Sequence, residues 1–182
     1  MEAAFARFDA FPHASLAAWL PRFPPGRIER IYLHWSAGDY ETVYPAYHYC
    51  IALHDGIPLV VETHDLLAKA QHTYQRNANA AGLSIMAMRD ARPHDFGAFP
   101  LVQSAVDALC TVAAAIAHAY AIPIDASRIL THAEAAIVDG YFGEGDEQRW
   151  DIARLHPSPE PLTEREAQAT GDYLRALIAA AL

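Results

Sequence analysis

Two histidines and one aspartate have the residue types that a metal site requires. His34 ends an apolar segment and is followed by a loop of small residues, and His132 ends a second, shorter apolar segment. Asp151 lies 19 positions beyond His132. Two imidazoles and a carboxylate form a ligand set of catalytic zinc, with a fourth position left to water. Spacing alone does not define such a site, and the alternative is that each histidine is an ordinary core or surface residue.

The pattern of apolar residues predicts the strands that would position these side chains. A hairpin turn at Asp55 and Gly56 joins two of them. The expected strands are 28–35, 46–53, 57–61, 82–88 and 127–131.

Helices are expected at 14–20, at 100–120 and from Thr163 onward. Apolar residues recur every three or four positions along 100–120, and Thr163 and Glu166 have capping-box spacing. The glycine-rich, acidic segment 140–149 is expected to be a loop. Because helices alternate loosely with strands, the sequence predicts a single α/β domain with a mixed, mostly central β-sheet flanked by helices.

Composition limits the partners and the setting. The net charge is −9, with 13 basic and 22 acidic residues, so the clustered Lys and Arg of a nucleic-acid surface are missing. No apolar run approaches the ~20 residues of a membrane span. Segment 1–9 lacks the basic and apolar regions of a secretory signal. We therefore expect a cytoplasmic protein in which Cys50 and Cys110 are buried, reduced thiols.

Four segments resemble, in the same order, the motifs of the type 2 N-acetylmuramoyl-L-alanine amidases. This family includes the phage lysozyme-type amidases and the peptidoglycan recognition proteins. The resemblance runs from about 28 to 155 and is carried by residues 31–38, 46–56, 72–85 and 131–155. It implies one amidase-like or peptidoglycan-recognition-like domain over 1–182, with a helical extension at 1–27, a catalytic core at 28–155 and a C-terminal helix at 156–182.

The resemblance also implies roles for individual residues. His34, His132 and Asp151 match the zinc ligands of the family. Tyr47 matches a tyrosine near the metal-bound water, and the alternative for Tyr47 is an aromatic pair across two strands. The neighbouring His48 is expected to point to the opposite face of its strand and to be structural.

The chain departs from the family pattern at two positions. Arg149 stands where a lysine is usual, so its role would be electrostatic, since a guanidinium does not easily give up a proton. The alternative for Arg149 is a surface salt bridge. Ser84 stands where some cytoplasmic members carry a catalytic glutamate. The general base is therefore open between hydroxide on the metal, Glu134 and a group not yet identified; the alternative for Glu134 is an acidic residue in the first turn of a helix.

Polar residues of the third segment could line a substrate groove. His72, Asn77 and Asn79 are the candidates, because muramyl peptides offer many hydroxyl and amide partners. The alternative is that these three are loop residues in turns.

The expected activity is that of a metal-binding hydrolase, an N-acetylmuramoyl-L-alanine amidase with Zn²⁺ as cofactor. Its substrate would be peptidoglycan or a soluble muropeptide, in cell-wall degradation by an endolysin-like phage or prophage protein or in the processing of wall fragments. One alternative is a protein of the same fold that binds peptidoglycan without cutting it. Another is an unrelated fold whose motifs match by chance.

Overall fold

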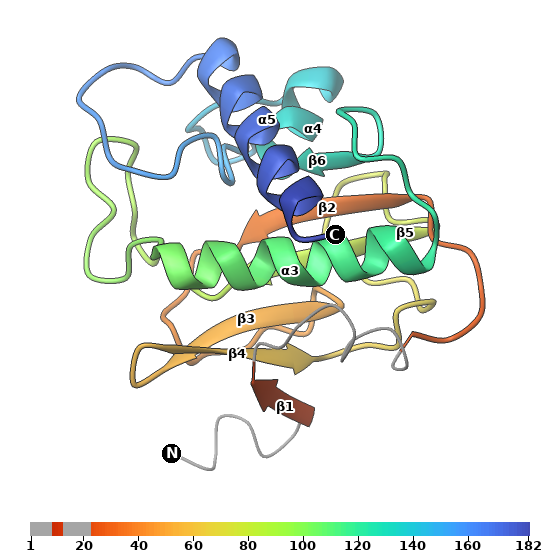
Figure 1. Cartoon of the computed structure of the whole chain (residues 1–182). Coiled ribbons are helices and arrows are strands. Elements are labelled where there is room, and N and C mark those ends of the chain that lie inside the picture. Colours follow the sequence, from red (N-terminus) through yellow and green to blue (C-terminus); the bar gives the residue numbers. More distant parts are fainter. Residues whose placement is uncertain (1–8, 13–22) are drawn as a thin grey trace.

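A mixed six-stranded β-sheet forms the centre of the protein in the computed structural model, which describes residues 9–12 and 23–182 (Figure 1). The order of strands across the sheet is β1-β4-β3-β5-β2-β6. The strands are β1 (Asp9–Pro12), β2 (Arg30–Trp35), β3 (Tyr49–His54), β4 (Ile57–Glu62), β5 (Ala80–Ile85) and β6 (Ile129–Thr131). The α/β class predicted from the sequence is confirmed.

Parallel and antiparallel pairs divide the sheet into two halves. The strands β3, β5, β2 and β6 run parallel to one another, whereas β4 pairs antiparallel with β3 and with β1. The predicted hairpin turn is present, because Asp55 and Gly56 connect β3 to β4 with φ values of 50° and 77°. Positive φ at both central residues is the geometry that suits the twist of a two-residue hairpin.

Three helices complete the described part of the chain: α3 (Gln103–Ala119), α4 (His132–Asp139) and α5 (Glu164–Ala180). Helix α3 lies across one face of the sheet and contacts β2, β3, β4 and β5, and α5 packs against α3 and α4 (Figure 1). Helix α3 agrees with the prediction for 100–120. Helix α5 begins where expected, since the Thr163 side chain accepts a hydrogen bond from the Glu166 amide.

Some elements differ from the prediction. Strand β1 falls inside the expected helical extension. Its four residues end in a proline and pair with the outer edge of β4. A segment this short has no alternating pattern from which a strand could be predicted. Helix α4 was not among the expected helices. A helix at this position was considered only in the alternative that Glu134 is an acidic residue in a first helical turn. The predicted helix at 14–20 lies outside the described residues. Strand β3 starts at Tyr49, three positions after the expected start.

The two faces of the sheet have different compositions because side chains alternate along each strand. Ile31, Leu33 and Trp35 of β2 join the main hydrophobic core, which also contains the buried side of α3. His34 therefore points to the other face, together with Tyr32 of a smaller apolar cluster. Both cysteines, Cys50 and Cys110, are free and buried, as predicted.

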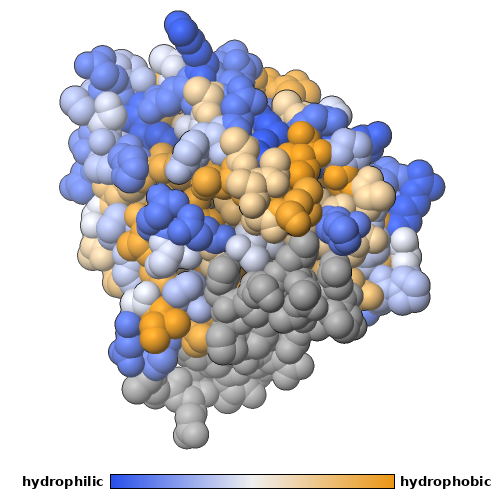
Figure 2. Space-filling view, viewed as in Figure 1, coloured by the Kyte–Doolittle hydropathy of each residue, from blue (hydrophilic) through white to orange (hydrophobic). Residues whose placement is uncertain are grey.

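The outer surface over α3 and α5 is mixed. Hydrophilic side chains cover the first half of α5, and hydrophobic surface is exposed near its end (Figure 2). None of the helices in 9–12 and 23–182 combines the length and the hydropathy that a bilayer-spanning helix needs.

Candidate metal centre

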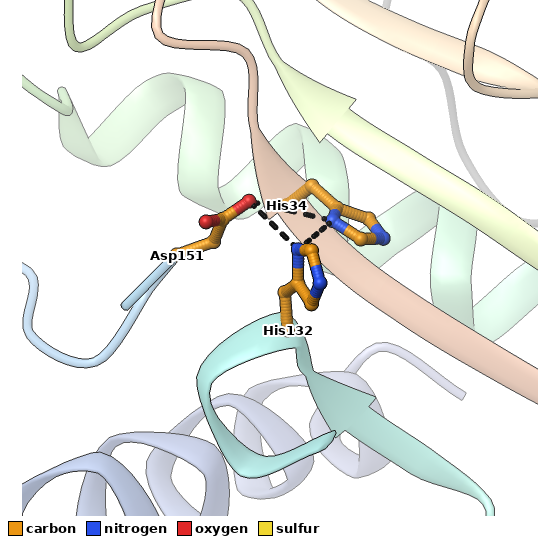
Figure 3. A group of neighbouring side chains, drawn as sticks. All are labelled: His34, His132 and Asp151. Atoms are coloured by element: carbon orange, nitrogen blue, oxygen red, sulfur yellow. Dashed lines mark hydrogen bonds and ion pairs between the residues drawn. The ribbon is translucent and has the colours of Figure 1, made fainter. Parts of the chain in front are cut away.

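His34, His132 and Asp151 converge on one point (Figure 3). The Nδ1 atoms of the two histidines are 3.1 Å apart, and Oδ2 of Asp151 lies 3.1 Å from His132 Nδ1 and 3.5 Å from His34 Nδ1. All three residues are buried. Two imidazoles and a carboxylate that are far apart along the chain thus present one ligand atom each to a shared position.

The spacing of these three atoms fits a tetrahedral metal ion. Zinc is bound by imidazole nitrogen and carboxylate oxygen at about 2.0–2.2 Å, which separates neighbouring ligand atoms by about 3.3 Å in a tetrahedral site. The observed separations are 3.1–3.5 Å. The donor set is also one that zinc accepts, with three protein ligands and one position left open. The buried group can therefore hold a metal ion.

The register of the sheet brings the first two ligands together. His34 is aligned with Ser84 of β5, and Leu33 is aligned with Thr131 of β6. The residue after Thr131 is His132, the first residue of α4, so it lies beside His34 at the carboxyl ends of two parallel strands. The Thr131 hydroxyl accepts a hydrogen bond from the Glu134 amide in the first turn, which fixes the start of α4 and with it the position of His132.

Asp151 lies in a loop that is held in place by two contacts, one of the Asp151 backbone and one of the Trp150 side chain. The carbonyl oxygen of Asp151 accepts a hydrogen bond of 3.1 Å from the amide of Ala133, in the first turn of α4. The amides of a first helical turn have no partner within the helix, so the Ala133 amide is free to bind the loop. Trp150, the preceding residue, packs against Trp35.

Burial and mutual contact set the protonation of the group. Burial lowers the pKa of His34 to about 4, against an opposing hydrogen bond with Asp151, so its imidazole is neutral at pH 7. Burial alone would raise the pKa of Asp151, but its electrostatic interaction and hydrogen bond with His132, followed by its hydrogen bond with His34, outweigh burial and hold that pKa well below its usual value. A neutral imidazole and an ionised carboxylate are the forms that bind metal.

An open cavity of about 860 Å³ adjoins the group, and His132 lies on its wall. The segment around His72 and the loop around Arg149 form its other walls. The lining residues are Lys69, Gln71, His72, Thr73, Tyr74, Gln75, Asn77, His132, Tyr141, Asp146, Glu147 and Arg149. A volume of this size suits a ligand of several chemical groups.

Tyr47 packs beside the first ligand, with 5.2 Å between the ring centroids of Tyr47 and His34. It precedes β3, so the alternative of an aromatic pair across two strands does not hold. Burial and the charge of Asp151 raise the pKa of Tyr47, against a hydrogen bond with Ser84. The phenol is therefore protonated at pH 7 and can donate a hydrogen bond.

His48 is structural, as predicted, although the argument from opposite strand faces was wrong because His48 also precedes β3. Its Nε2 lies 2.9 Å from the carbonyl oxygen of Ala68, and its Nδ1 accepts a hydrogen bond from the Gly82 amide. Both nitrogens are thus engaged with the backbone.

The residues expected in the groove divide into two groups. His72 and Asn77 lie on the cavity wall, and the Asn77 side chain accepts hydrogen bonds from the amides of His72 and Thr73, so it also shapes the loop. Asn79 is exposed, has a φ of 50° and is not on the wall, which corresponds to the turn alternative. Arg149 lies on the wall, exposed, and its guanidinium donates to the carbonyl groups of Asp146 and Gln148 within its own loop.

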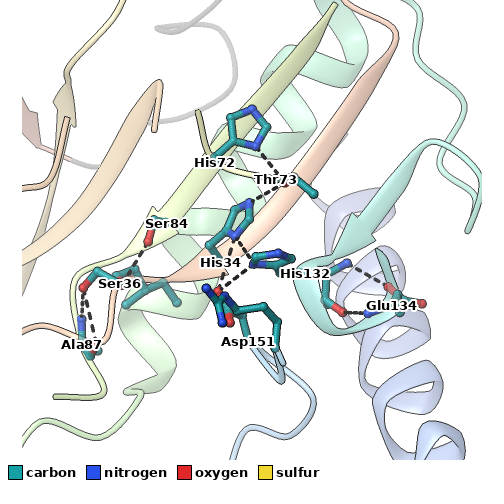
Figure 4. Close-up of polar contacts among 12 residues, drawn as sticks. His34, Ser36, His72, Thr73, Ser84, Ala87, His132, Glu134 and Asp151 are labelled. Carbon is teal, nitrogen blue, oxygen red and sulfur yellow. Dashed lines mark hydrogen bonds and ion pairs between the residues drawn. The ribbon is translucent and has the colours of Figure 1, made fainter. Parts of the chain in front are cut away.

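Glu134 does not face the metal group. Figure 4 shows Glu134 pointing away from His34 and Asp151. Its carboxylate accepts hydrogen bonds from the Thr131 amide and from the guanidinium of Arg175 on α5, at 2.8–3.0 Å. It completes the capping box of α4, so the alternative of an acidic residue in the first turn is the one observed. The expectation that Glu134 serves as general base is therefore not supported, because its oxygen atoms are already paired within the protein.

Two residues near the site were not predicted from the sequence. Thr73 lies with its hydroxyl between His34 and His72. Tyr141 has its ring 6.0 Å from that of His132, and its buried hydroxyl makes no hydrogen bond with any described residue. Thr73 follows His72 directly, but nothing in the sequence indicates the direction of its hydroxyl.

Comparisons with protein-family models and with curated protein sequences found no match.

Proposed function

We propose that this protein is a zinc-dependent hydrolase that cuts the amide between N-acetylmuramic acid and L-alanine in peptidoglycan or its fragments. The observation that carries the proposal is the convergence of His34, His132 and Asp151, with ligand atoms 3.1–3.5 Å apart, next to an open cavity. The substrate class comes from the resemblance of residues 28–155 to the type 2 amidases.

His34, His132 and Asp151 would hold the ion. When bound, zinc supplies Lewis acidity and lowers the pKa of a coordinated water. The side chains around it have separate tasks. Tyr47, whose raised pKa keeps it protonated, donates a hydrogen bond to the oxyanion that forms at the substrate carbonyl. Arg149 contributes positive charge from the cavity wall.

The proton acceptor has to be another group than Ser84 or Glu134. A serine is not a base by itself, and the Glu134 carboxylate is paired with Arg175. Asp146 and Glu147 are the carboxylates on the wall of the cavity. We therefore include these two as candidates for the group that takes a proton from the attacking water and returns it to the leaving amine.

A second candidate function is binding of muramyl peptide without cleavage. It is favoured by the serine at position 84 and by the pairing of Glu134, which leave the metal group without a carboxylate neighbour at either position. The two functions require the same cavity but differ in whether the amide is cut.

Metal analysis and digestion separate these functions. We expect one equivalent of zinc in the purified protein, and release of the L-alanine peptide from a soluble muropeptide or from purified sacculi, followed by mass spectrometry. Zinc and peptide binding without release would favour the binding protein. Lack of tight metal binding would exclude both the hydrolase and the metal site.

A further inference from the structure

The Thr73 hydroxyl joins two buried imidazoles (Figure 4). Its Oγ1 lies 3.3 Å from Nε2 of His34 and 3.0 Å from Nδ1 of His72. Thr73 is 2% exposed and His34 is fully buried, so water does not compete for these contacts. Nε2 is the nitrogen of His34 that points away from the metal group, whose ligand atom is Nδ1.

The segment that carries Thr73 is held firmly in place. The Asn77 side chain accepts hydrogen bonds from the amides of Thr73 and His72, at 2.8 and 3.2 Å. The ring of His72 packs directly over Gly82 of β5, where a Cβ atom would overlap it. The position of the hydroxyl is therefore set by the loop and by the sheet beneath it, independently of any ligand.

The chemistry of a metal-bound imidazole fixes the direction of the hydrogen bond between His34 and Thr73 in the metal-loaded protein. A neutral imidazole has one N–H, and a nitrogen that binds metal has none. Metal on Nδ1 of His34 therefore leaves the proton on Nε2, which donates to Thr73. The second neighbour of the hydroxyl is Nδ1 of His72. A hydroxyl has one hydrogen and two lone pairs, so it can bond this nitrogen in either tautomer of His72. Nε2 of His72 is buried and has no hydrogen-bond partner among the described residues.

We propose that Thr73 is a positioning residue for the metal centre. It accepts a hydrogen bond from His34, is anchored by a second hydrogen bond with His72, and so holds His34 in the tautomer and ring orientation that direct the Nδ1 lone pair at the ion. This inference rests on the proposed metal-dependent function and adds to it the outer partner of one ligand.

The type of partner has a physical reason. A carboxylate is a common outer partner of a ligating histidine. Here a second carboxylate would stand close to Asp151, in a buried region where like charges repel strongly. A hydroxyl backed by a neutral imidazole orients His34 without adding charge. Burial, followed by the neighbouring histidines His34 and His48, lowers the pKa of His72, in line with an uncharged ring.

Two substitutions at this position test the proposal through metal affinity. Thr73→Val keeps the shape and removes the hydroxyl, whereas Thr73→Ser keeps the hydroxyl. In competition with a chromophoric chelator, we expect Thr73→Val to bind zinc about 10–100-fold more weakly than the wild type, the usual effect of losing an outer partner, and Thr73→Ser to stay within about threefold. Thr111→Val makes the same change in α3, away from the site, and should leave zinc affinity unaltered.

The tautomers give a second measurement that a purely structural role would not move. Long-range ¹H–¹⁵N spectra of the zinc-loaded wild type should show His34 protonated on Nε2. A proton on Nδ1 of His34 would overturn the proposal, as would a Thr73→Val protein that binds zinc as tightly as the wild type. If the wild type itself takes up no zinc, the proposed function fails, and this inference fails with it.

Discussion

Trp35 and Trp150 pack edge to face, with 4.9 Å between their ring centroids and 71° between their planes. Trp35 directly follows His34, and Trp150 directly precedes Asp151. The contact therefore joins the end of β2 to the loop that carries the third ligand. Hydrophobic packing of the two tryptophans thus helps to bring His34 and Asp151 together, although they lie far apart along the chain.

Loss of this contact should weaken both the fold and the metal site. Trp150 is 8% exposed and also packs against Phe96. Trp150→Ala should lower the free energy of unfolding by about 3–5 kcal/mol, as for other large-to-small core changes. Zinc affinity, measured under conditions where the variant remains folded, should fall as well. Trp150→Phe is the control and should recover most of both quantities; equal zinc affinity in Trp150→Ala would show that the loop is held by other contacts.

Removal of the carboxylate should affect metal binding far more than folding. Asp151→Ala removes one of the three proposed protein ligands. Zinc affinity should therefore fall further than the 10–100-fold, roughly, that follows the loss of an outer partner. The backbone hydrogen bond from Ala133 to the carbonyl of residue 151 does not depend on the side chain, so the fold should survive. Elemental analysis and circular dichroism check the two parts. Unchanged metal content would show that the ligand assignment is wrong.

Glu134 and Arg175 should behave as a structural pair. Both side chains are buried, at 7% and 8% exposure, and their closest atoms are 2.8 Å apart. Glu134→Ala leaves the guanidinium with fewer partners in a buried position, so urea unfolding should show a loss of about 3–5 kcal/mol. Zinc content per folded molecule should not change. A variant that keeps its stability but loses hydrolysis would instead point to Glu134 as a catalytic group.

The two thiols should be unreactive in the folded protein. Burial raises the pKa of Cys50 to about 12 and that of Cys110 to about 12, so the thiolate is scarce at pH 8. Alkylation by iodoacetamide should be at least about 100-fold slower than for free cysteine. Both residues should react rapidly in 6 M guanidinium, which serves as the control. Rapid labelling of one thiol without denaturant would reveal local opening at that residue.

The positions of the two histidines could be predicted because they depend on strand patterns. His34 and His132 each end a short apolar segment, and parallel strands bring such ends to one edge of a sheet. Asp151 carries no such signal. It sits in a loop, and its place depends on Trp150 and on the first turn of α4.

The side-chain partners could not be predicted, since they depend on directions that the sequence does not encode locally. Glu134 is two positions after His132, but helix α4 turns its carboxylate toward α5, where Arg175 lies 41 positions away. Thr73 is the reverse case, because its sequence position suggests an ordinary loop residue. In the structure, its hydroxyl lies beside Nε2 of His34 on β2.

Leu33 and His34 are adjacent in β2 but belong to opposite sides of the sheet. Changes in the layer of α3 and Leu33 alter how tightly the scaffold is packed, whereas changes in the layer of His34 alter what the scaffold can bind. The pleat of one strand thus separates two kinds of substitution. Residues on one side can be replaced to change the chemistry of the site while the packing on the other side stays as it is.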